Sequence, residues 1–146
     1  MSKIYGLAAL RIGWAYASQE VADNLNRLRQ PFNMSTLAQK AALAALNDQG
    51  FVARNVEHNQ EWQSYLVEQL DNLGLASLPS AGNFITVQFP TDQNHNATKA
   101  MNFLHDRRII PRTTTDYGMP DFMRITVGLE EENIALVRAL KEFLEG

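Results

Sequence analysis

"FMRITVG", residues 122–128, is the stretch of this chain that most clearly indicates its fold. Alternate side chains along it share a face: Met123, Ile125 and Val127 form an apolar set, and Arg124 belongs to the opposite, mixed set. Strict alternation over this length is typical of a β-strand with one buried face. The stretch therefore predicts a strand with Met123, Ile125 and Val127 on one face and Arg124 on the other.

The preceding segments predict further parts of a small α+β unit. "NFITVQF", residues 83–89, alternates in the same way and ends at Pro90, so it predicts a second strand. Helical spacing is expected over residues 96–108. A short extended piece follows at 109–115, where Pro111 favours an edge position because proline cannot donate to a sheet ladder.

Two amphipathic patterns predict helices at opposite ends of the chain. The final helix is predicted over residues 130–146. Its expected inward residues are Ile134, Val137, Leu140 and Leu144. Residues 18–30 predict another helix, in which Val21, Leu25 and Leu28 recur at helical spacing. Pro31 stops that pattern.

A long helical region is expected after this break. Thr36 and Gln39 have the spacing of a capping box at its start. The alanine-rich residues 38–45 indicate close packing against a neighbour. Gly50 is the expected interruption, after which helical spacing resumes and ends at Gly74.

The apolar run "LAALRIGWAYAS", residues 7–18, predicts a buried strand. A single strand and the helix after it cannot bury both of their faces. We therefore expect residues 1–30 to be the C-terminal edge of a larger domain, and residues 31–146 to form a small C-terminal α+β domain with a long connecting helix. The predicted fold class is α/β, with an α+β small domain.

Composition narrows the classes of function. The chain has 146 residues, a formal net charge of −3 and no cysteine, so disulfides and thiolate metal sites are excluded. No polybasic run predicts nucleic-acid binding, and no apolar stretch approaches the roughly 20 residues of a membrane span. The cytoplasm is the default location. His58, His95 and His105 lack metal-ligand spacing and are expected at the surface, so no metal site is predicted.

Three arginines occupy positions where a charge is costly. Arg11 interrupts an apolar run, Arg112 follows Pro111, and Arg124 lies within a predicted strand. A guanidinium held near a core needs an anion, because desolvating it unpaired costs several kcal/mol. The partner is either an internal Asp or Glu, or a ligand carboxylate or phosphate that the planar fork binds bidentately.

Lys3 follows Ser2 directly, and Gly6 and then Arg11 come after it in the chain. A lysine there is either an ordinary solvated charge or an amine that attacks a carbonyl, with Arg11 and the Ser2 hydroxyl holding a phosphate of the same ligand. A reactive lysine and a bound phosphate are what a pyridoxal 5'-phosphate site requires.

"SKIYGLAALRIGW", residues 2–14, closely resembles the S-K-x-x-G-L-A-G-L-R-x-G-Y stretch of fold-type I pyridoxal phosphate aminotransferases. The resemblance continues through "RQPFNMSTLAQKAALAAL", residues 29–46, then residues 83–89, and then "RIIPRTTTDYGMPDFMRITVG", residues 108–128. It covers essentially the whole chain and is closest to histidinol-phosphate aminotransferases. The family has Gly at the position of Ala9 and an aliphatic residue at that of Pro111.

The resemblance implies a role for each matching residue. Lys3 would be the catalytic lysine that binds the cofactor and moves the α-proton, and Ser2 and Arg11 would hold the cofactor phosphate. Arg112 and Arg124 would bind the anionic groups of the substrates. Asn83 and Tyr117 match substrate-side landmarks of the family, but a turn and a packing role explain them equally well.

The implied activity is transfer of an amino group between histidinol phosphate, or an aromatic amino acid, and 2-oxoglutarate, in a homodimer that binds no nucleic acid or membrane. Family members are longer and carry further cofactor-binding residues upstream, so we expect a C-terminal fragment that is inactive alone. The alternatives are a non-catalytic domain for dimerisation or protein contact, and a related enzyme such as threonine-phosphate decarboxylase.

Overall fold

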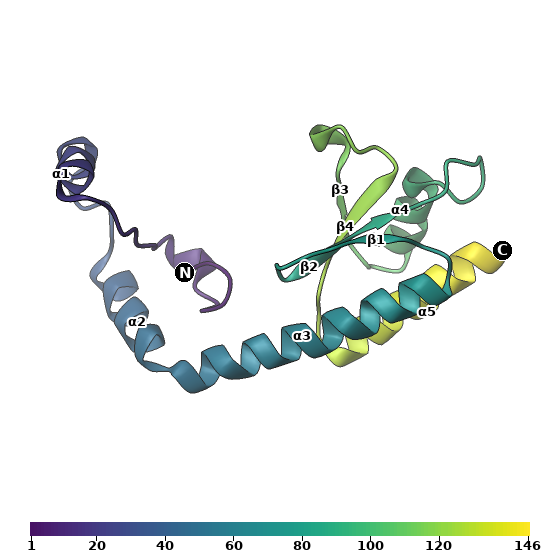
Figure 1. Cartoon of the computed structure of the whole chain (residues 1–146), viewed down its shortest axis with the longest axis horizontal. Coiled ribbons are helices and arrows are strands. Elements are labelled where there is room, and N and C mark those ends of the chain that lie inside the picture. Colours follow the sequence, from purple (N-terminus) through teal and green to yellow (C-terminus); the bar gives the residue numbers. More distant parts are fainter. The chain divides into compact units, whose positions relative to one another are not determined.

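A computed structural model describes all residues, 1–146. The chain packs as two compact units, Met1–Glu57 (unit 1) and His58–Gly146 (unit 2), and the boundary falls inside one long helix. Helices and a single antiparallel sheet make up the fold (Figure 1). No helix combines the length and the apolar character needed to cross a bilayer.

Unit 1 consists of short helices around a very small core. Its elements are a 3-10 helix at Ala8–Leu10, α1 at Gln19–Leu28, α2 at Thr36–Asn47 and the beginning of α3, Gln49–Asn72. Its buried apolar residues are Ile12, Ala38 and Ala42, with Met1 and Leu10 packed against them. The predicted close packing of the alanine-rich helix is therefore confirmed at these two alanines.

The strand predicted over residues 7–18 is wrong. Ala8–Leu10 form a 3-10 turn, Arg11 adopts a left-handed conformation with φ 49°, and residues 12–18 have no regular structure. Trp14 is 71% exposed. A strand must pair its backbone N–H and C=O groups with a neighbouring strand, and unit 1 contains none.

The helical predictions in unit 1 hold, with local corrections. The helix after Ser18 and the break at Pro31 are confirmed, although α1 buries none of its residues. The cap of α2 is Ser35, not Thr36, because the Ser35 hydroxyl accepts from Ala38 N at 3.1 Å. The interruption lies at Asp48, which caps Phe51 N at 2.9 Å, while Gly50 is helical.

Unit 2 is a four-stranded sheet with helices on one face. After α3 come β1 (Ser77–Leu78), β2 (Phe84–Gln88), α4 (Ala97–Asp106), β3 (Arg112–Thr113), a 3-10 turn (Thr115–Tyr117), β4 (Phe122–Thr126) and α5 (Glu130–Glu145). The strand order is β1-β2-β4-β3 and every pair is antiparallel. The edge position predicted for the extended piece around Pro111 is confirmed.

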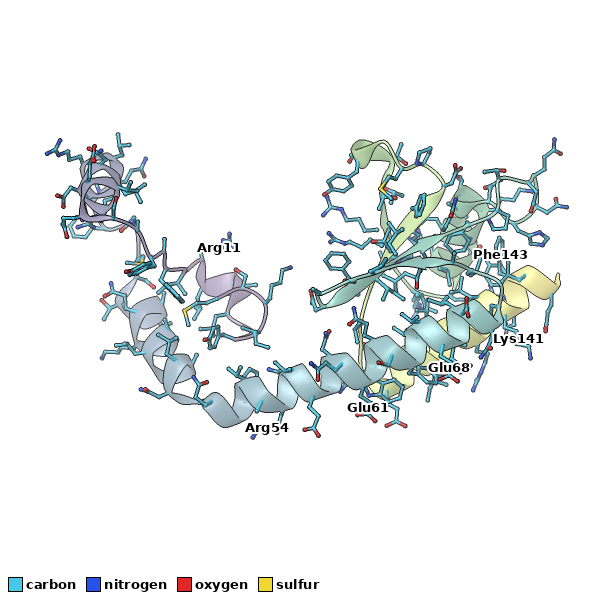
Figure 2. The ribbon with its side chains drawn as sticks, in the orientation of Figure 1. Arg11, Arg54, Glu61, Glu68, Lys141 and Phe143 are labelled. Carbon is cyan, nitrogen blue, oxygen red and sulfur yellow. The ribbon has the colours of Figure 1, made fainter.

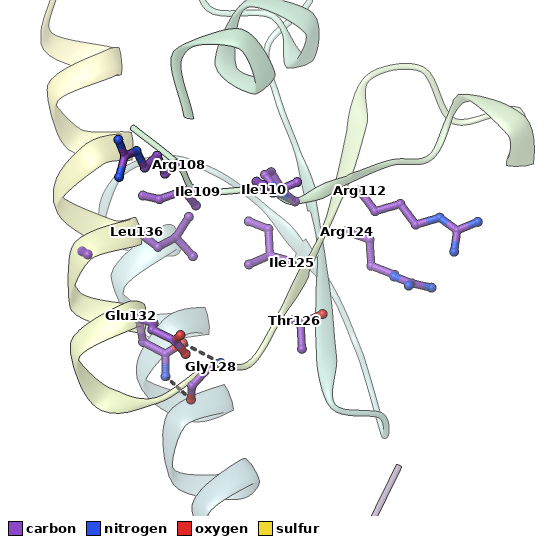
Figure 3. Close-up of a pocket in the computed structure, with 13 residues that line it drawn as sticks. Arg108, Ile109, Ile110, Arg112, Arg124, Ile125, Thr126, Gly128, Glu132 and Leu136 are labelled. Atoms are coloured by element: carbon purple, nitrogen blue, oxygen red, sulfur yellow. Dashed lines mark hydrogen bonds between the residues drawn. The ribbon is translucent and has the colours of Figure 1, made fainter. Parts of the chain in front are cut away.

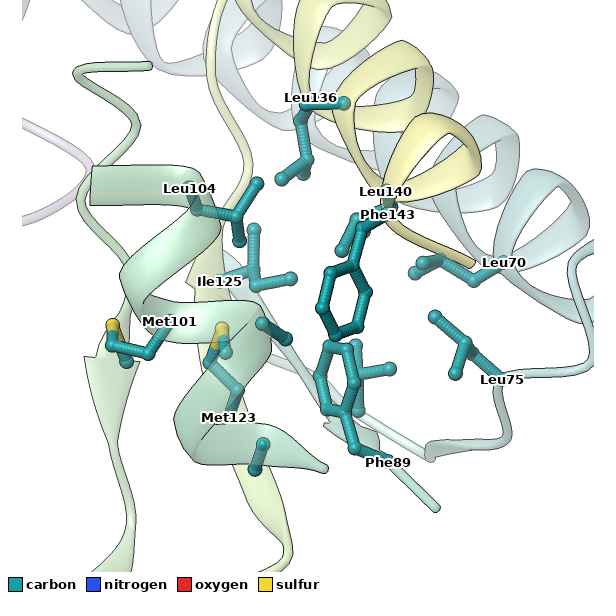
Figure 4. Packing of buried hydrophobic residues seen from close by; sticks show 14 of the residues in the cluster. Leu70, Leu75, Phe89, Met101, Leu104, Met123, Ile125, Leu136, Leu140 and Phe143 are labelled. Atoms are coloured by element: carbon teal, nitrogen blue, oxygen red, sulfur yellow. The ribbon is translucent and has the colours of Figure 1, made fainter. Parts of the chain in front are cut away.

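The core of unit 2 lies between the sheet and helices α3, α4 and α5 (Figure 4). Met123 and Ile125 are buried in it, as the alternation in β4 predicts. The inward face predicted for α5 is partly wrong, because Leu136, Leu140 and Phe143 fill the core while Ile134 is 36% exposed. The predicted and the observed sets of inward residues both have helical spacing, and the position of the sheet decides which set is buried.

Candidate functional site

Arg112 and Arg124 lie directly opposite each other across the β3–β4 pair. Met123 and Ile125 point into the core, so Arg124 occupies the opposite face of β4, where it is half-buried. Figure 3 shows the two guanidinium groups extending side by side, away from Ile125 and Leu136. The sheet register therefore brings together the two arginines that the sequence predicts as anion-binding residues.

Neither arginine is neutralised by the protein. The ion pairs within 4.0 Å are His95–Asp92, Arg107–Glu142 and Lys141–Glu145. Like charges directly opposite on neighbouring strands are destabilising, and here no internal acid offsets the repulsion. No acid of this chain therefore pairs with Arg112, which is exposed, or with Arg124, which is half-buried. The costly position predicted for Arg112 is wrong, because an exposed guanidinium is solvated by water.

Aromatic rings support both guanidinium groups. Arg124 lies over the Phe84 ring, 4.8 Å from its centroid, and Arg112 lies 5.7 Å from the centroid of Tyr117. A ring stacked on one face of a guanidinium restricts it while leaving the in-plane N–H groups available to a ligand. The arrangement can therefore hold a carboxylate or phosphate through planar, directed hydrogen bonds.

A cavity of about 400 Å³ adjoins the arginine pair. Its lining combines apolar residues with three arginines and one acid, namely Ile110, Ile125 and Leu136, then Arg108, Arg112 and Arg124, and Glu132. Arg108 adopts a left-handed conformation with φ 61°. The cavity is therefore lined by apolar residues and by charged residues of both signs.

Ser2, Lys3 and Arg11 belong to two successive turns at the start of unit 1, with Lys3 in the first and Arg11 at the end of the second. Gly6 N donates to Lys3 O at 2.8 Å, and Leu7 N donates to Met1 O at 3.3 Å, so the chain folds back on itself. Met1 and Leu10, the neighbours of Ser2 and Arg11, pack on the same small cluster. Figure 2 marks Arg11 after the 3-10 helix.

These three residues fit a phosphorylated aldehyde. The Lys3 side chain is exposed, and no carboxylate lies within 4.0 Å of Lys3 or Arg11. One Arg11 N–H donates to Ala8 O at 2.9 Å, which leaves other guanidinium donors for a phosphate. An amine, a guanidinium and a hydroxyl are the kinds of group that pyridoxal 5'-phosphate needs from a protein.

Two of the three histidine predictions need correction. His105 is exposed, but His58 is half-buried and its Nε2 lies 3.0 Å from Gly128 O. His95 is also half-buried, with its ring edge-on to Phe143 at 5.6 Å between centroids. A surface position was expected because helical periodicity does not show which polar residues meet a strand end.

The sequence analysis names Tyr117 but not two other residues of this region, Phe84 beside Arg124 and Arg108 in the cavity lining. Alternation does place Phe84 on the face opposite Ile85 and Val87, so pairing this strand with the Arg124 strand would have found the contact.

Known proteins similar to this chain identify its family. The family model for "Aminotransferase class I and II" matches residues 1–140. A histidinol-phosphate aminotransferase of Maricaulis maris is 44% identical over 144 residues, which are 99% of this chain and 40% of that protein. The chain thus spans about two fifths of the length of the curated relatives it matches.

Two crystal structures share the fold. The histidinol-phosphate aminotransferase of Sinorhizobium meliloti, solved with pyridoxal-5'-phosphate, gives a TM-score of 0.86 at 30% identity and covers 99% of this chain and 39% of its own. The histidinol-phosphate aminotransferase of Clostridium acetobutylicum gives a TM-score of 0.90 at 20% identity and covers 99% of this chain and 44% of its own. At this identity the match shows the fold alone. The predicted fold class, part of a pyridoxal phosphate-dependent transferase fold, is therefore confirmed. The chain belongs to the aminotransferase class I and II family.

Proposed function

We propose that this chain carries part of the active site of an aminotransferase that uses pyridoxal 5'-phosphate. The enzyme would move an amino group between histidinol phosphate, or an aromatic amino acid, and 2-oxoglutarate. The observation that carries the proposal is the Arg112–Arg124 pair, two guanidinium groups side by side without an acid of the protein. The relatives named above support the choice of histidinol phosphate.

Ser2, Lys3 and Arg11 each have a distinct task in this proposal. Lys3 supplies the amine that binds the cofactor aldehyde and later carries the proton between the substrate carbon and the cofactor carbon. Ser2 and Arg11 bind the cofactor phosphate. When bound, the cofactor supplies an electron-accepting ring that weakens the α C–H bond of the substrate.

Arg112 and Arg124 bind the anionic end of each substrate. One enzyme must accept both a phosphate-bearing amine and the carboxylates of 2-oxoglutarate, and a pair of guanidinium groups suits both kinds of anion. The non-catalytic alternative requires these arginines to be paired internally. Their lack of an acidic partner within 4.0 Å favours the enzymatic proposal.

The proposal includes the wider assembly. Residues 1–30 would form the edge of a large cofactor-binding domain, and residues 31–146 the small domain. The enzyme would be a cytoplasmic homodimer. Exposed apolar side chains in unit 1, among them Tyr16 at 96% and Phe32 at 99%, are the kind of surface that other protein surfaces cover in an assembly.

Chemical trapping tests the cofactor site. The chain is incubated with pyridoxal 5'-phosphate, reduced with borohydride, digested and mapped by mass spectrometry. We expect the label on Lys3 in preference to Lys40, Lys99 and Lys141, and less of it in Arg11→Gln than in the control Arg27→Gln. Equal labelling of the four lysines would contradict the assignment.

Binding measurements test the substrate site. Histidinol phosphate is titrated into the isotope-labelled chain, and resonances of β3 and β4 are followed. We expect Arg124→Gln to weaken binding about tenfold or more, since a charge-assisted bidentate contact is lost. Arg138→Gln, an exposed change on α5, serves as the control. Equal affinities of the two variants would sink the assignment of Arg124.

A further inference from the structure

Two adjacent residues of α3 donate hydrogen bonds to strand ends. His58 Nε2 lies 3.0 Å from Gly128 O, and Asn59 Nδ2 donates to Gly82 O at 3.1 Å. A carbonyl oxygen can only accept, so Nε2 of His58 carries the proton. Both side chains are half-buried, where such bonds are protected from competing water.

The two glycines flank the same end of the β2–β4 pair. Phe84, near the start of β2, pairs with Thr126 at the end of β4. Val127 N also donates to Asn83 O at 2.9 Å, which extends the pairing toward the glycines. His58 and Asn59 therefore hold the two strands where β2 begins and β4 ends. We refer to these two residues as the α3 clamp.

The end of β4 is fixed by a second element. Gly128 N donates to Asn133 Oδ1 at 2.9 Å, and Asn133 Nδ2 donates to Gly128 O at 2.9 Å. The Gly128 carbonyl thus accepts from both α3 and α5, which uses its two lone pairs. A Cβ at Gly128 would lie 2.6 Å from Glu132 Oε2, so only glycine fits without displacing that side chain.

Phe84 lies at the clamped end of β2, whereas Arg124 lies in the middle of β4, where it pairs with Thr86. The Phe84 ring packs on Gly82, where an added Cβ would lie 3.0 Å from the ring. The Arg124 guanidinium lies 4.8 Å from the centroid of that ring. Contacts through Gly82 and Phe84 thus connect Asn59 to Arg124, and Gly128 and β4 connect His58 to it.

We propose that His58 and Asn59 are positioning residues that set the place of the Arg124 guanidinium. The inference rests on the proposed function, in which Arg124 binds the substrate anion. Bidentate binding of a carboxylate or phosphate demands a fixed guanidinium plane, and small displacements at such a site are costly. The clamp ties the β2–β4 end to a long helix, so its loss lets the Phe84–Arg124 stack shift.

Arginine side-chain NMR tests the inference on the full chain. The Nε–Hε resonance of Arg124, assigned by its absence in Arg124→Lys, carries a ring-current shift from Phe84. The variants are His58→Phe, which keeps a ring but removes the donor, and Asn59→Leu. His58→Gln keeps an amide donor. Asn55→Leu is the matched control, because it removes a bond of the same kind from α3 to Ile4 O in unit 1.

We expect His58→Phe and Asn59→Leu to reduce the ring-current shift and to weaken inorganic phosphate binding at Arg124 by about three- to tenfold, the worth of one hydrogen bond. His58→Gln should reduce the ring-current shift and the phosphate affinity less than His58→Phe does. Asn55→Leu should change neither quantity. Dispersed amide resonances of unit 2 show that a variant is folded. If either His58→Phe or Asn59→Leu unfolds, the other variant alone tests the inference.

An unchanged ring-current shift in a folded clamp variant would overturn the inference, even if stability falls. A different result is also possible: phosphate does not bind the unmodified chain at Arg124, but the clamp variants still lose the ring-current shift. That result supports the positioning role and contradicts the proposed substrate role of Arg124, so the two failures are distinguishable.

Discussion

The two units of this chain differ sharply in how much core they have. Unit 2 buries sixteen apolar residues from α3, β2, α4, β4, α5 and the adjoining loops, whereas unit 1 buries three. Hydrophobic stabilisation scales with the apolar area removed from water, about 25 cal/mol per Å², so unit 2 gains most of it. The Arg112–Arg124 pair therefore lies on a scaffold with its own core, while the Lys3 turn is held by very few contacts.

The difference also appears in what each unit leaves exposed. Apolar residues of α1 with the spacing of a buried face, Val21, Leu25 and Leu28, are 48%, 53% and 81% exposed. In unit 2 the equivalent stripe of α5 is covered by the sheet. The lesson is that an amphipathic helix is stabilised by the surface it packs on, not by its pattern alone.

The largest effect is expected from emptying the core of unit 2. Leu140 is fully buried, so Leu140→Ala should cost about 2–5 kcal/mol of unfolding free energy through lost burial and the cavity left behind. Leu43→Ala in unit 1, at a site 64% exposed, should cost less than about 0.5 kcal/mol. Urea unfolding is followed by the fluorescence of Trp62, in a Trp14→Phe background. Equal losses would break the comparison between the units.

An intermediate effect is expected at the helix caps, which are chemically matched in the two units. Ser35 Oγ accepts from Ala38 N at 3.1 Å, and Asn96 Oδ1 accepts from Lys99 N at 3.0 Å. Replacing either cap by Ala should cost about 1 kcal/mol. Hydrogen exchange should then accelerate by about fivefold throughout α2, but only in the first turn of α4, which is held by buried residues such as Met101 and Leu104. Exchange that spreads equally through both helices would contradict this.

The smallest effect is a pH dependence in unit 2. The pKa of Asp92 is lowered because the backbone N–H of His95, and then that of Asn94, donate to its carboxylate at 2.7 Å. A lowered folded-state pKa means that the ionised carboxylate stabilises the fold above the unfolded-state pKa. This contribution is lost as the pH falls through the folded-state value.

Asp92→Asn keeps an acceptor but cannot ionise, so its stability should vary less between about pH 6 and pH 2 than that of the unmodified chain. Thermal unfolding across this range, followed by Trp62 fluorescence, measures the difference. Identical pH profiles for the two proteins would show that Asp92 contributes nothing, and the assignment of this acid effect to unit 2 would fail.

Much of the fold could be predicted because its signals are local. The strand over 83–89, the edge position after Pro111 and the end of α3 at Gly74 all follow from alternation, missing donors and turn geometry. The run 7–18 could not be predicted in the same way, because an apolar stretch adopts a strand only beside another strand. The face of α5 was predicted in part: Leu140 is buried and Val137 and Leu144 pack against the core, but Ile134 is exposed and Leu136 lies inside.

In the candidate site too, local features could be predicted from the sequence and long-range contacts could not. The sequence by itself determined the alternation that places Arg124 on the face opposite Met123 and Ile125. The costly positions predicted for Arg11 and Arg112 are wrong, because both side chains are exposed. Only the tertiary structure decided that Arg112 faces Arg124, that Phe84 stacks on Arg124, and that His58 reaches Gly128, 70 positions away. Side-chain alternation is a property of neighbouring residues, whereas strand register and helix docking depend on the packing of the whole unit.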